Sequence, residues 1–167
     1  SYHPKLAFSQ LSGDTAGWRS KETLYNTSTG TYYGTNLTDI YKGEWIQIDL
    51  SSNIFVDSYN LAGWLSTNQN NHNSSPKKGY LLSSLDGKDW RLAHTFDYAG
   101  DHADYTIDPS NNRSVINNKI TNNQNAIGRY WRFVVEKLFP GCHNYAVIMN
   151  LALIGVKYPS QTIQGEV

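Results

Sequence analysis

Short runs in which apolar and polar residues are interspersed recur along the chain, and turn-forming residues bound each run. The clearest runs are, in chain order, 45–50 (WIQIDL), 60–65 (NLAGWL), 79–83 (GYLLS), 129–136 (RYWRFVVE) and 146–157 (AVIMNLALIGVK). In the first run Trp45 and two isoleucines alternate with Gln47 and Asp49. This pattern predicts a strand with one face toward solvent.

An Asp-Gly pair at Asp86 and Gly87 separates two of these apolar runs. Such a pair predicts a hairpin turn, because glycine readily adopts the positive φ that the turn needs. No segment sustains a helical spacing of apolar residues over three turns. We therefore expect an all-β fold, an antiparallel β-sandwich (jelly roll) of about eight strands with long loops at one end.

Composition agrees with this fold, since 12 Tyr and 5 Trp favour strands and 17 Asn favour loops. The 167 residues suit one domain, which we expect to span 1–158, with 159–167 as a polar linker or tail. Lys+Arg and Asp+Glu balance at 14 each, which argues against a nucleic-acid partner. The single cysteine, Cys142, has no partner for an internal disulfide.

Four segments in a fixed order carry a family resemblance. They are 16–24 (AGWRSKETL), 42–50 (KGEWIQIDL), 80–90 (YLLSSLDGKDW) and 128–133 (GRYWRF). Together they resemble the discoidin family, the coagulation-factor type C domains that share a jelly-roll fold with galactose-binding modules. The resemblance covers about residues 6–158. It implies that Trp45 and Trp90 are core aromatics and that Arg129 or Arg132 pairs with a carboxylate.

The resemblance also bears on calcium. In the sugar-binding branch of the family, a glutamate that begins the last strand lies near a structural calcium ion, and Asn150 stands at that position here. The loop Asn26–Thr31 is in the right place to supply carbonyl ligands. We expect no cofactor, and the sequence leaves the presence of a metal undecided.

Three loops map to the binding end of the sandwich by resemblance: 13–19, 64–78 and 139–145. They carry planar aromatic, guanidinium, imidazole and amide groups, which suit the apolar face and the hydroxyls of a sugar. The candidate ligand-binding residues are Trp18, Arg19, Trp64, Asn70, His72, Phe139, His143 and Asn144.

We therefore expect a lectin-like module without catalytic activity that binds glycans of a cell or host surface and acts in adhesion or attachment. An extracellular, cell-surface or virion-surface location follows from that role. No nucleophile elbow, metal-binding histidine pair or phosphate loop indicates an enzyme. The alternatives are binding to a phospholipid membrane surface, or a role as an interaction module of a larger surface or virion protein. The sequence does not give the oligomeric state.

Overall fold

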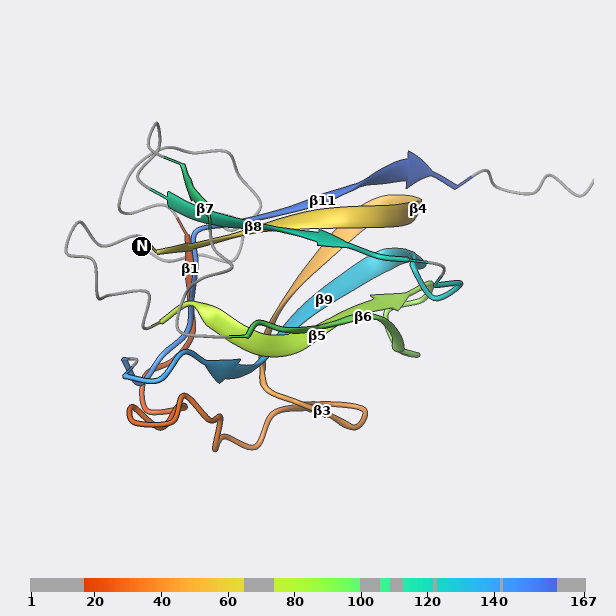
Figure 1. The fold of residues 1–167 in the computed structure, drawn as a ribbon. Helices are drawn as coiled ribbons and strands as arrows, with labels where there is room; N and C mark the ends of the chain where they lie inside the picture. Colours follow the sequence, from red (N-terminus) through yellow and green to blue (C-terminus); the bar gives the residue numbers. More distant parts are fainter. Residues whose placement is uncertain are drawn as a thin grey trace, which may run out of the picture.

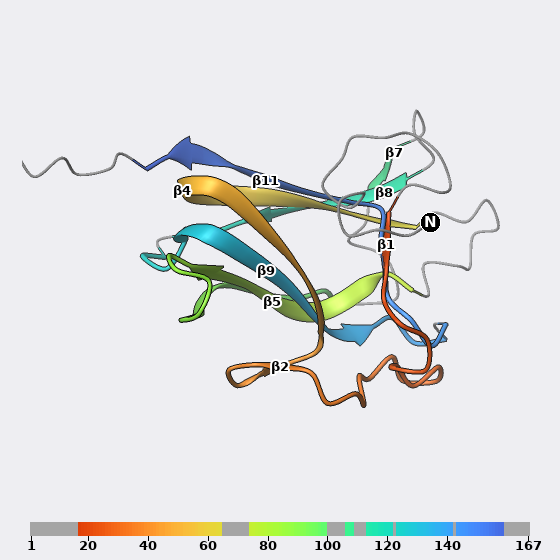
Figure 2. The ribbon, with the colours of Figure 1, turned by 180° about the vertical axis from the view of Figure 1, so that it is seen from behind.

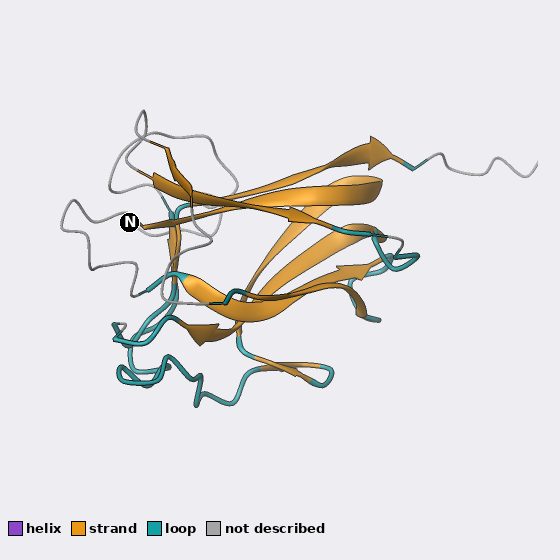
Figure 3. Cartoon of the chain, viewed as in Figure 1, coloured by secondary structure: helices purple, strands orange, loops and turns teal. Residues whose placement is uncertain are grey.

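The computed structural model describes residues 17–64, 74–99, 106–108, 113–121, 123–141 and 143–158, and this part of the chain contains strands and no helix (Figure 3). The strands are β1 (Trp18–Arg19), β2 (Leu37–Thr38), β3 (Tyr41–Lys42), β4 (Glu44–Trp64), β5 (Pro76–Ser84), β6 (Arg91–Asp97), β7 (Thr106–Asp108), β8 (Arg113–Lys119), β9 (Ile127–Leu138), β10 (Val147–Ile148) and β11 (Asn150–Lys157). The predicted all-β fold is confirmed. Across the described ranges no helix could span a membrane.

The long strand β4 belongs to both layers of the sandwich (Figure 1). Its first part pairs with β9, and its last part pairs with β11 on one side and β8 on the other. Between the two parts the register shifts from Asp49 to Ile54, and Ser51 adopts a φ of 62°. We call β6, β5, β9 and the first part of β4 the front sheet. The last part of β4, with β11, β8 and β7, is the back sheet.

The main core lies between these two sheets. Ile46, Phe133 and Leu81 occupy neighbouring positions on three strands of the front sheet, and each is at most 1% exposed. Tyr59 and Leu61 on β4 face them from the back sheet and are fully buried. Every second residue of each strand thus points inward, as the period of a β-strand requires. The alternation of Ile46 and Ile48 with Gln47 and Asp49 predicts this arrangement correctly, whereas Trp45 lies on the same face as Gln47.

The turn between β5 and β6 confirms the predicted hairpin. Gly87 has a φ of 79°, and the carboxylate of Asp86 accepts hydrogen bonds from the backbone N–H groups of Lys88 and Asp89 at 2.8 and 3.0 Å. These bonds lower the pKa of Asp86 to about 2, because they stabilise its charged form.

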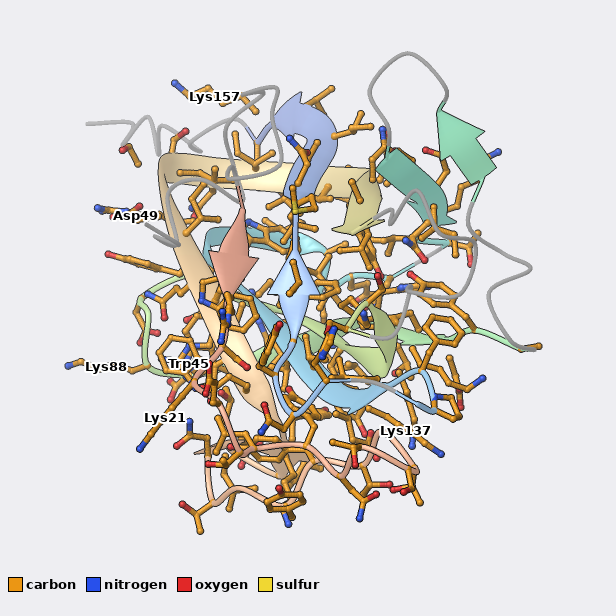
Figure 4. The ribbon with its side chains drawn as sticks, turned by 90° about the vertical axis from the view of Figure 1, so that its left-hand side faces the viewer. Lys21, Trp45, Asp49, Lys88, Lys137 and Lys157 are labelled. Carbon is orange, nitrogen blue, oxygen red and sulfur yellow. The ribbon has the colours of Figure 1, made fainter. Side chains whose placement is uncertain are left out.

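The outer face of the front sheet departs from the prediction. Trp45 and Trp90 are half-buried there instead of lying in the core. The guanidinium of Arg132 lies between them, 4.0 Å from the ring of Trp45 and 4.2 Å from that of Trp90. In the end-on view of Figure 4, Trp45 lies on the same side of the molecule as Lys21 and Lys88, and Lys88 lies farther out. The expectation that both tryptophans are core residues is wrong, because Trp45 alternates with the inward-facing Ile46 on β4 and Trp90 lies in the connection just before β6.

The two arginines of β9 have different partners. Arg129 donates two hydrogen bonds of 2.7 Å to the carboxylate of Asp49, as the resemblance implies. Arg132 instead donates to Gln47 at 2.8 Å and to the hydroxyl of Thr38 at 3.0 Å. Arg132 therefore ties the β2–β3 hairpin to β4 and β9.

Candidate functional site

The strands β1 and β10 pair at one end of the sandwich, at the left in Figure 1 and at the right in the reverse view of Figure 2. Trp18 lies opposite Ile148, and Arg19 lies opposite Val147. Trp18 is 6% exposed and belongs to the main core, whereas Arg19 is partly exposed. The sequence leaves two readings of Trp18 open, an exposed stacking platform and a residue that closes the end of the core, and its burial favours the second.

Backbone hydrogen bonds hold two loops together at this end. The N–H of Ser20 donates to the carbonyl of Ala146 at 3.0 Å, and the N–H of Ala146 donates to the Ser20 hydroxyl at 2.9 Å. The carbonyl of Asn144 accepts the N–H groups of Leu24 and Tyr25 at 3.0 and 3.3 Å. Residues that follow β1 are therefore fixed against residues that precede β10, which reduces the entropy lost when a ligand binds.

Three planar side chains meet where these loops join. The guanidinium of Arg19 lies 3.8 Å from the centre of the Tyr145 ring, and the imidazole of His143 is stacked on the same ring with centroids 5.2 Å apart and planes 5° apart. Arg19 also forms an ion pair with Glu22. Tyr145 is held from below by a small apolar cluster, which consists of Ala62, Val147 and Met149. We call Arg19, His143 and Tyr145 the loop-end stack.

The loop-end stack presents the groups that a sugar needs. His143 is exposed, and Tyr145 and Asn144 are partly exposed. An imidazole can donate and accept a hydrogen bond, a phenol can do both, and an amide can bridge two hydroxyls. Flat rings also suit the apolar face of a pyranose. The arrangement can thus bind a small polar ligand at the surface.

The remaining predicted residues do not join this stack. Phe139 is fully buried in the main core, and the Lys77 ammonium lies 4.9 Å from its ring. Phe139 therefore has no surface for a ligand, and its assignment to the site is wrong. Trp64 ends β4 with its backbone opposite Arg113. The side chain of Trp64 lies outside the described part of the structure, as do Asn70 and His72.

In the loop Asn26–Thr31, two oxygens of Asn26 bond to the loop itself and are not turned toward a calcium site. The loop contains no carboxylate, and the Asn26 side-chain oxygen accepts the N–H groups of Ser28 and Thr29 at 2.9 and 3.0 Å. The Asn26 carbonyl accepts the N–H of Gly30 at 2.8 Å. These oxygens close the loop on itself and are turned to its own backbone. Within the described ranges, no three His, Cys, Asp or Glu side chains gather as a metal site.

Tyr145 and Glu22 are the two members of the site that sequence reasoning misses. Tyr145 lies in the predicted third loop, directly after His143 and Asn144. Its place just before the apolar run at 146–157 is the available signal, because a residue beside a strand end can be both packed and exposed. Glu22 gives no signal of its own in the sequence.

Solved structures of other proteins have a fold similar to that of this chain. The chain is similar to CBM32-1 of a family 31 glycoside hydrolase from Clostridium perfringens (TM-score 0.55, 19% identity, 92% of this chain and 84% of that chain). It is also similar to CpGH89CBM32-5 of Clostridium perfringens, solved in complex with GalNAc-β-1,3-galactose (TM-score 0.52, 15% identity, 90% and 82%).

A third similar structure is a fragment described as a chitobiase from Bacteroides thetaiotaomicron (TM-score 0.50, 12% identity), of which the chain spans only 63%. No protein-family model and no curated protein sequence matches the chain. At these identities the similarity concerns the fold alone. The chain has the discoidin-like, galactose-binding-like β-sandwich fold of CBM32 modules.

Proposed function

We propose that the protein is a carbohydrate-binding module that holds its ligand at the loop-end stack. Two observations support the proposal. The fold is that of CBM32 modules, one of which was solved with GalNAc-β-1,3-galactose bound. The end of the sandwich formed by β1 and β10 presents planar polar side chains on loops that are fixed by backbone hydrogen bonds.

The observation that carries the proposal is the meeting of Arg19, Tyr145 and His143 from two loops far apart in the sequence. Tyr145 is packed from below and flanked by two groups that can hydrogen-bond sugar hydroxyls. A shallow surface site of this kind binds one sugar weakly, with a dissociation constant of about 10 µM to 1 mM.

Catalysis is not part of the proposal. Hydrolysis of a glycosidic bond ordinarily requires two carboxyl groups about 5–10 Å apart, one of which donates or accepts a proton. Among the described side chains of the loop-end stack and its contacts, Glu22 is the one carboxylate, and it forms an ion pair with Arg19. The proposed role is therefore binding. In that role the carboxylate of Glu22 positions Arg19.

Isothermal titration with galactose, with N-acetylgalactosamine and with GalNAc-β-1,3-galactose tests the proposal. We expect saturable binding of at least one of them, and a loss of at least about tenfold in affinity in Tyr145→Ala. Tyr33→Ala is the matched control, since Tyr33 is a 55% exposed tyrosine outside the stack. No binding by a folded protein at millimolar sugar, or an equal loss in both variants, would refute the proposal.

In this proposal the module attaches to glycans at the outside of a cell, of a host or of a virion. Fluorescently labelled protein should bind cultured cells that display the preferred sugar. Mild periodate treatment of the cells, which oxidises vicinal hydroxyls of sugars, should remove that binding. Retention on periodate-treated cells or on protein-free phosphatidylserine vesicles would favour the membrane-surface alternative instead.

A further inference from the structure

A carboxylate lies at the edge of the loop-end stack. The guanidinium of Arg19 donates a hydrogen bond to Glu22 and forms an ion pair with it. The side chain of Glu22 is 62% exposed, whereas that of Arg19 is 25% exposed. Because Glu22 is the more exposed partner, a ligand group that reaches Arg19 from solvent meets a negative charge beside the guanidinium.

A strained turn brings Glu22 back toward Arg19. Thr23, which follows Glu22, has a φ of 67°, in the left-handed region that β-branched residues rarely adopt. The Thr23 hydroxyl donates a hydrogen bond of 2.6 Å to the carbonyl of Glu22. Strain of this kind persists only where the surrounding structure enforces it, and it is concentrated at functional sites.

Hydrogen bonds to the opposite loop hold this turn at both ends. Before the turn, the N–H of Ser20 donates to the carbonyl of Ala146 at 3.0 Å. After the turn, the N–H of Leu24 donates to the carbonyl of Asn144, also at 3.0 Å. The opposite loop carries the other two members of the loop-end stack. The carboxylate of Glu22 therefore belongs to the same fixed unit as the proposed sugar-binding groups.

Two cationic side chains lie on segments next to the stack, and each has other surroundings. Lys21 extends to the side of the molecule on which Lys88 lies (Figure 4). The ammonium of Lys77 lies 4.9 Å from the ring of Phe139. Among the described side chains, Glu22 thus supplies the negative charge that contacts the stack.

A guanidinium that already contacts a carboxylate interacts differently with neutral and with acidic sugars. Sugar hydroxyls can share its N–H groups with Glu22, because a guanidinium has five donors, and they can also donate to the carboxylate. A carboxylate of a sugar must displace Glu22 or lie beside a like charge. At about 4 Å in water, the repulsion between two unit charges corresponds to about a fivefold loss of affinity.

We infer that Glu22 makes this site selective for uncharged sugars over sugars that carry a carboxylate. The inference rests on the proposed function and narrows the ligand class of the same site. Glu22 has two effects in this account: it holds the guanidinium of Arg19 in place, and it repels acidic ligands. A repulsive group of this kind is a common source of specificity, because it weakens binding of the competing ligand.

Isothermal titration with matched pairs of methyl glycosides tests the inference. The pairs are galactose with galacturonic acid, glucose with glucuronic acid, and N-acetylgalactosamine with N-acetylgalactosaminuronic acid. The members of each pair differ only in whether the terminal carbon is a hydroxymethyl or a carboxylate group. In the wild type, the acid should bind at least about fivefold more weakly than its neutral counterpart. Raising NaCl from about 0.05 M to about 0.5 M should reduce this ratio, because salt screens exposed charges.

Glu22→Gln removes the charge and keeps an oxygen that can accept a hydrogen bond from Arg19. In this variant the ratio of neutral to acidic affinity should fall at least about fivefold. Asp57→Asn is the matched control, because it removes an exposed carboxylate of β4 outside the stack and its loops. The ratio should stay as it is in the wild type.

Two results would overturn the inference while the proposed function stands. One is binding of an acidic sugar by the wild type as tight as that of its neutral counterpart, or tighter. The other is the same ratio in Glu22→Gln as in the wild type. Absence of binding of all of these sugars by the folded protein would refute the proposed function, and the inference with it.

Discussion

Two regions of the molecule each place an arginine against aromatic rings, and they differ in what holds the arginine. On the front sheet, Arg132 lies between Trp45 and Trp90 and donates hydrogen bonds to Gln47 and Thr38. Trp45, Gln47 and Thr38 lie on strands, Trp90 directly precedes β6, and the guanidinium is flanked by two rings. On this regular sheet, the contact between an arginine and aromatic rings thus serves mainly to hold segments together.

At the loop end, Arg19 lies over one ring, Tyr145, and its ion-pair partner Glu22 is exposed. His143 extends the stack into solvent. Loops that a rigid sandwich supports can leave such groups accessible without loss of the fold. The difference between the two regions shows that an arginine–aromatic contact indicates a ligand-binding site only where one side of the contact is exposed to solvent.

The largest expected difference between the regions is in stability. Trp18→Ala should lower the free energy of unfolding by about 3–5 kcal/mol, because it empties a site in the main core. Tyr145→Ala should lower the free energy of unfolding by about 1 kcal/mol only. Its main effect should be a reduced affinity for sugar. Urea denaturation measures both values. If Trp18→Ala lowers the free energy of unfolding only slightly and abolishes sugar binding, Trp18 belongs to the binding site.

The second expected effect concerns Arg132, the arginine between two tryptophan rings. Arg132→Ala should lower the free energy of unfolding by about 2–3 kcal/mol, since two ring contacts and two hydrogen bonds are lost together. Arg132→Lys should recover less than half of this, because an ammonium lacks the planar shape that fits between two rings. If Arg132→Lys matches the wild type in urea denaturation, the stacking account is wrong.

A third effect concerns His94, one of the five histidines of the chain. His94 is half-buried and its Nδ1 lies 2.9 Å from the hydroxyl of Tyr59, whereas His143 is exposed. Burial lowers the pKa of His94 below its ordinary value of 6.5, because the charged form is poorly solvated. The folded pKa is thus below the unfolded one, so the stability that neutral His94 provides is present above pH 6.5 and is lost as the pH falls.

Thermal unfolding between pH 5 and 8 checks this sign. The midpoint should fall as the solution becomes acidic, and His94→Gln should flatten that fall. A fall of the midpoint that is the same in His94→Gln as in the wild type would show that the titrating group is not His94.

The smallest effect belongs to the exposed pair of the front sheet. Hydrogen bonds from Arg129 contribute most to lowering the pKa of Asp49 to about 2, and both side chains are well exposed. Arg129→Ala should therefore raise the pKa of Asp49 toward 3.8, as followed by carboxyl carbon NMR, and leave the unfolding midpoint unchanged. An unfolding midpoint as low as that of Arg132→Ala would remove the contrast between the two arginines.

Much of the fold can be predicted from the sequence because it depends on local patterns. The alternation in 45–50 places Ile46 inward, and the Asp86–Gly87 pair closes the hairpin by its own hydrogen bonds. The environments of the tryptophans are harder to predict. Trp18 and Trp45 each follow or precede polar residues, and which face of the strand each occupies depends on pairing with β10 or β9. For that reason the sequence leaves Trp18 between the core and the surface and places Trp45 in the core incorrectly.

The candidate site is predictable only in part. Arg19 and His143 are correctly placed at one end, because the family resemblance orders the loops. Tyr145, which brings the two together, requires knowledge of the apolar cluster beneath it. That cluster joins β4 and β10 with residues distant in the sequence, and no local pattern encodes such a contact.

The most direct test of the account is amide chemical-shift mapping of the isotope-labelled protein during titration with GalNAc-β-1,3-galactose. The account predicts saturable shifts at residues 19–22 and 143–146, where the two loops meet, and none of comparable size around Trp45 and Trp90 on the front sheet. Absence of shifts at saturating disaccharide and at galactose alone, or shifts confined to the front sheet, would contradict it.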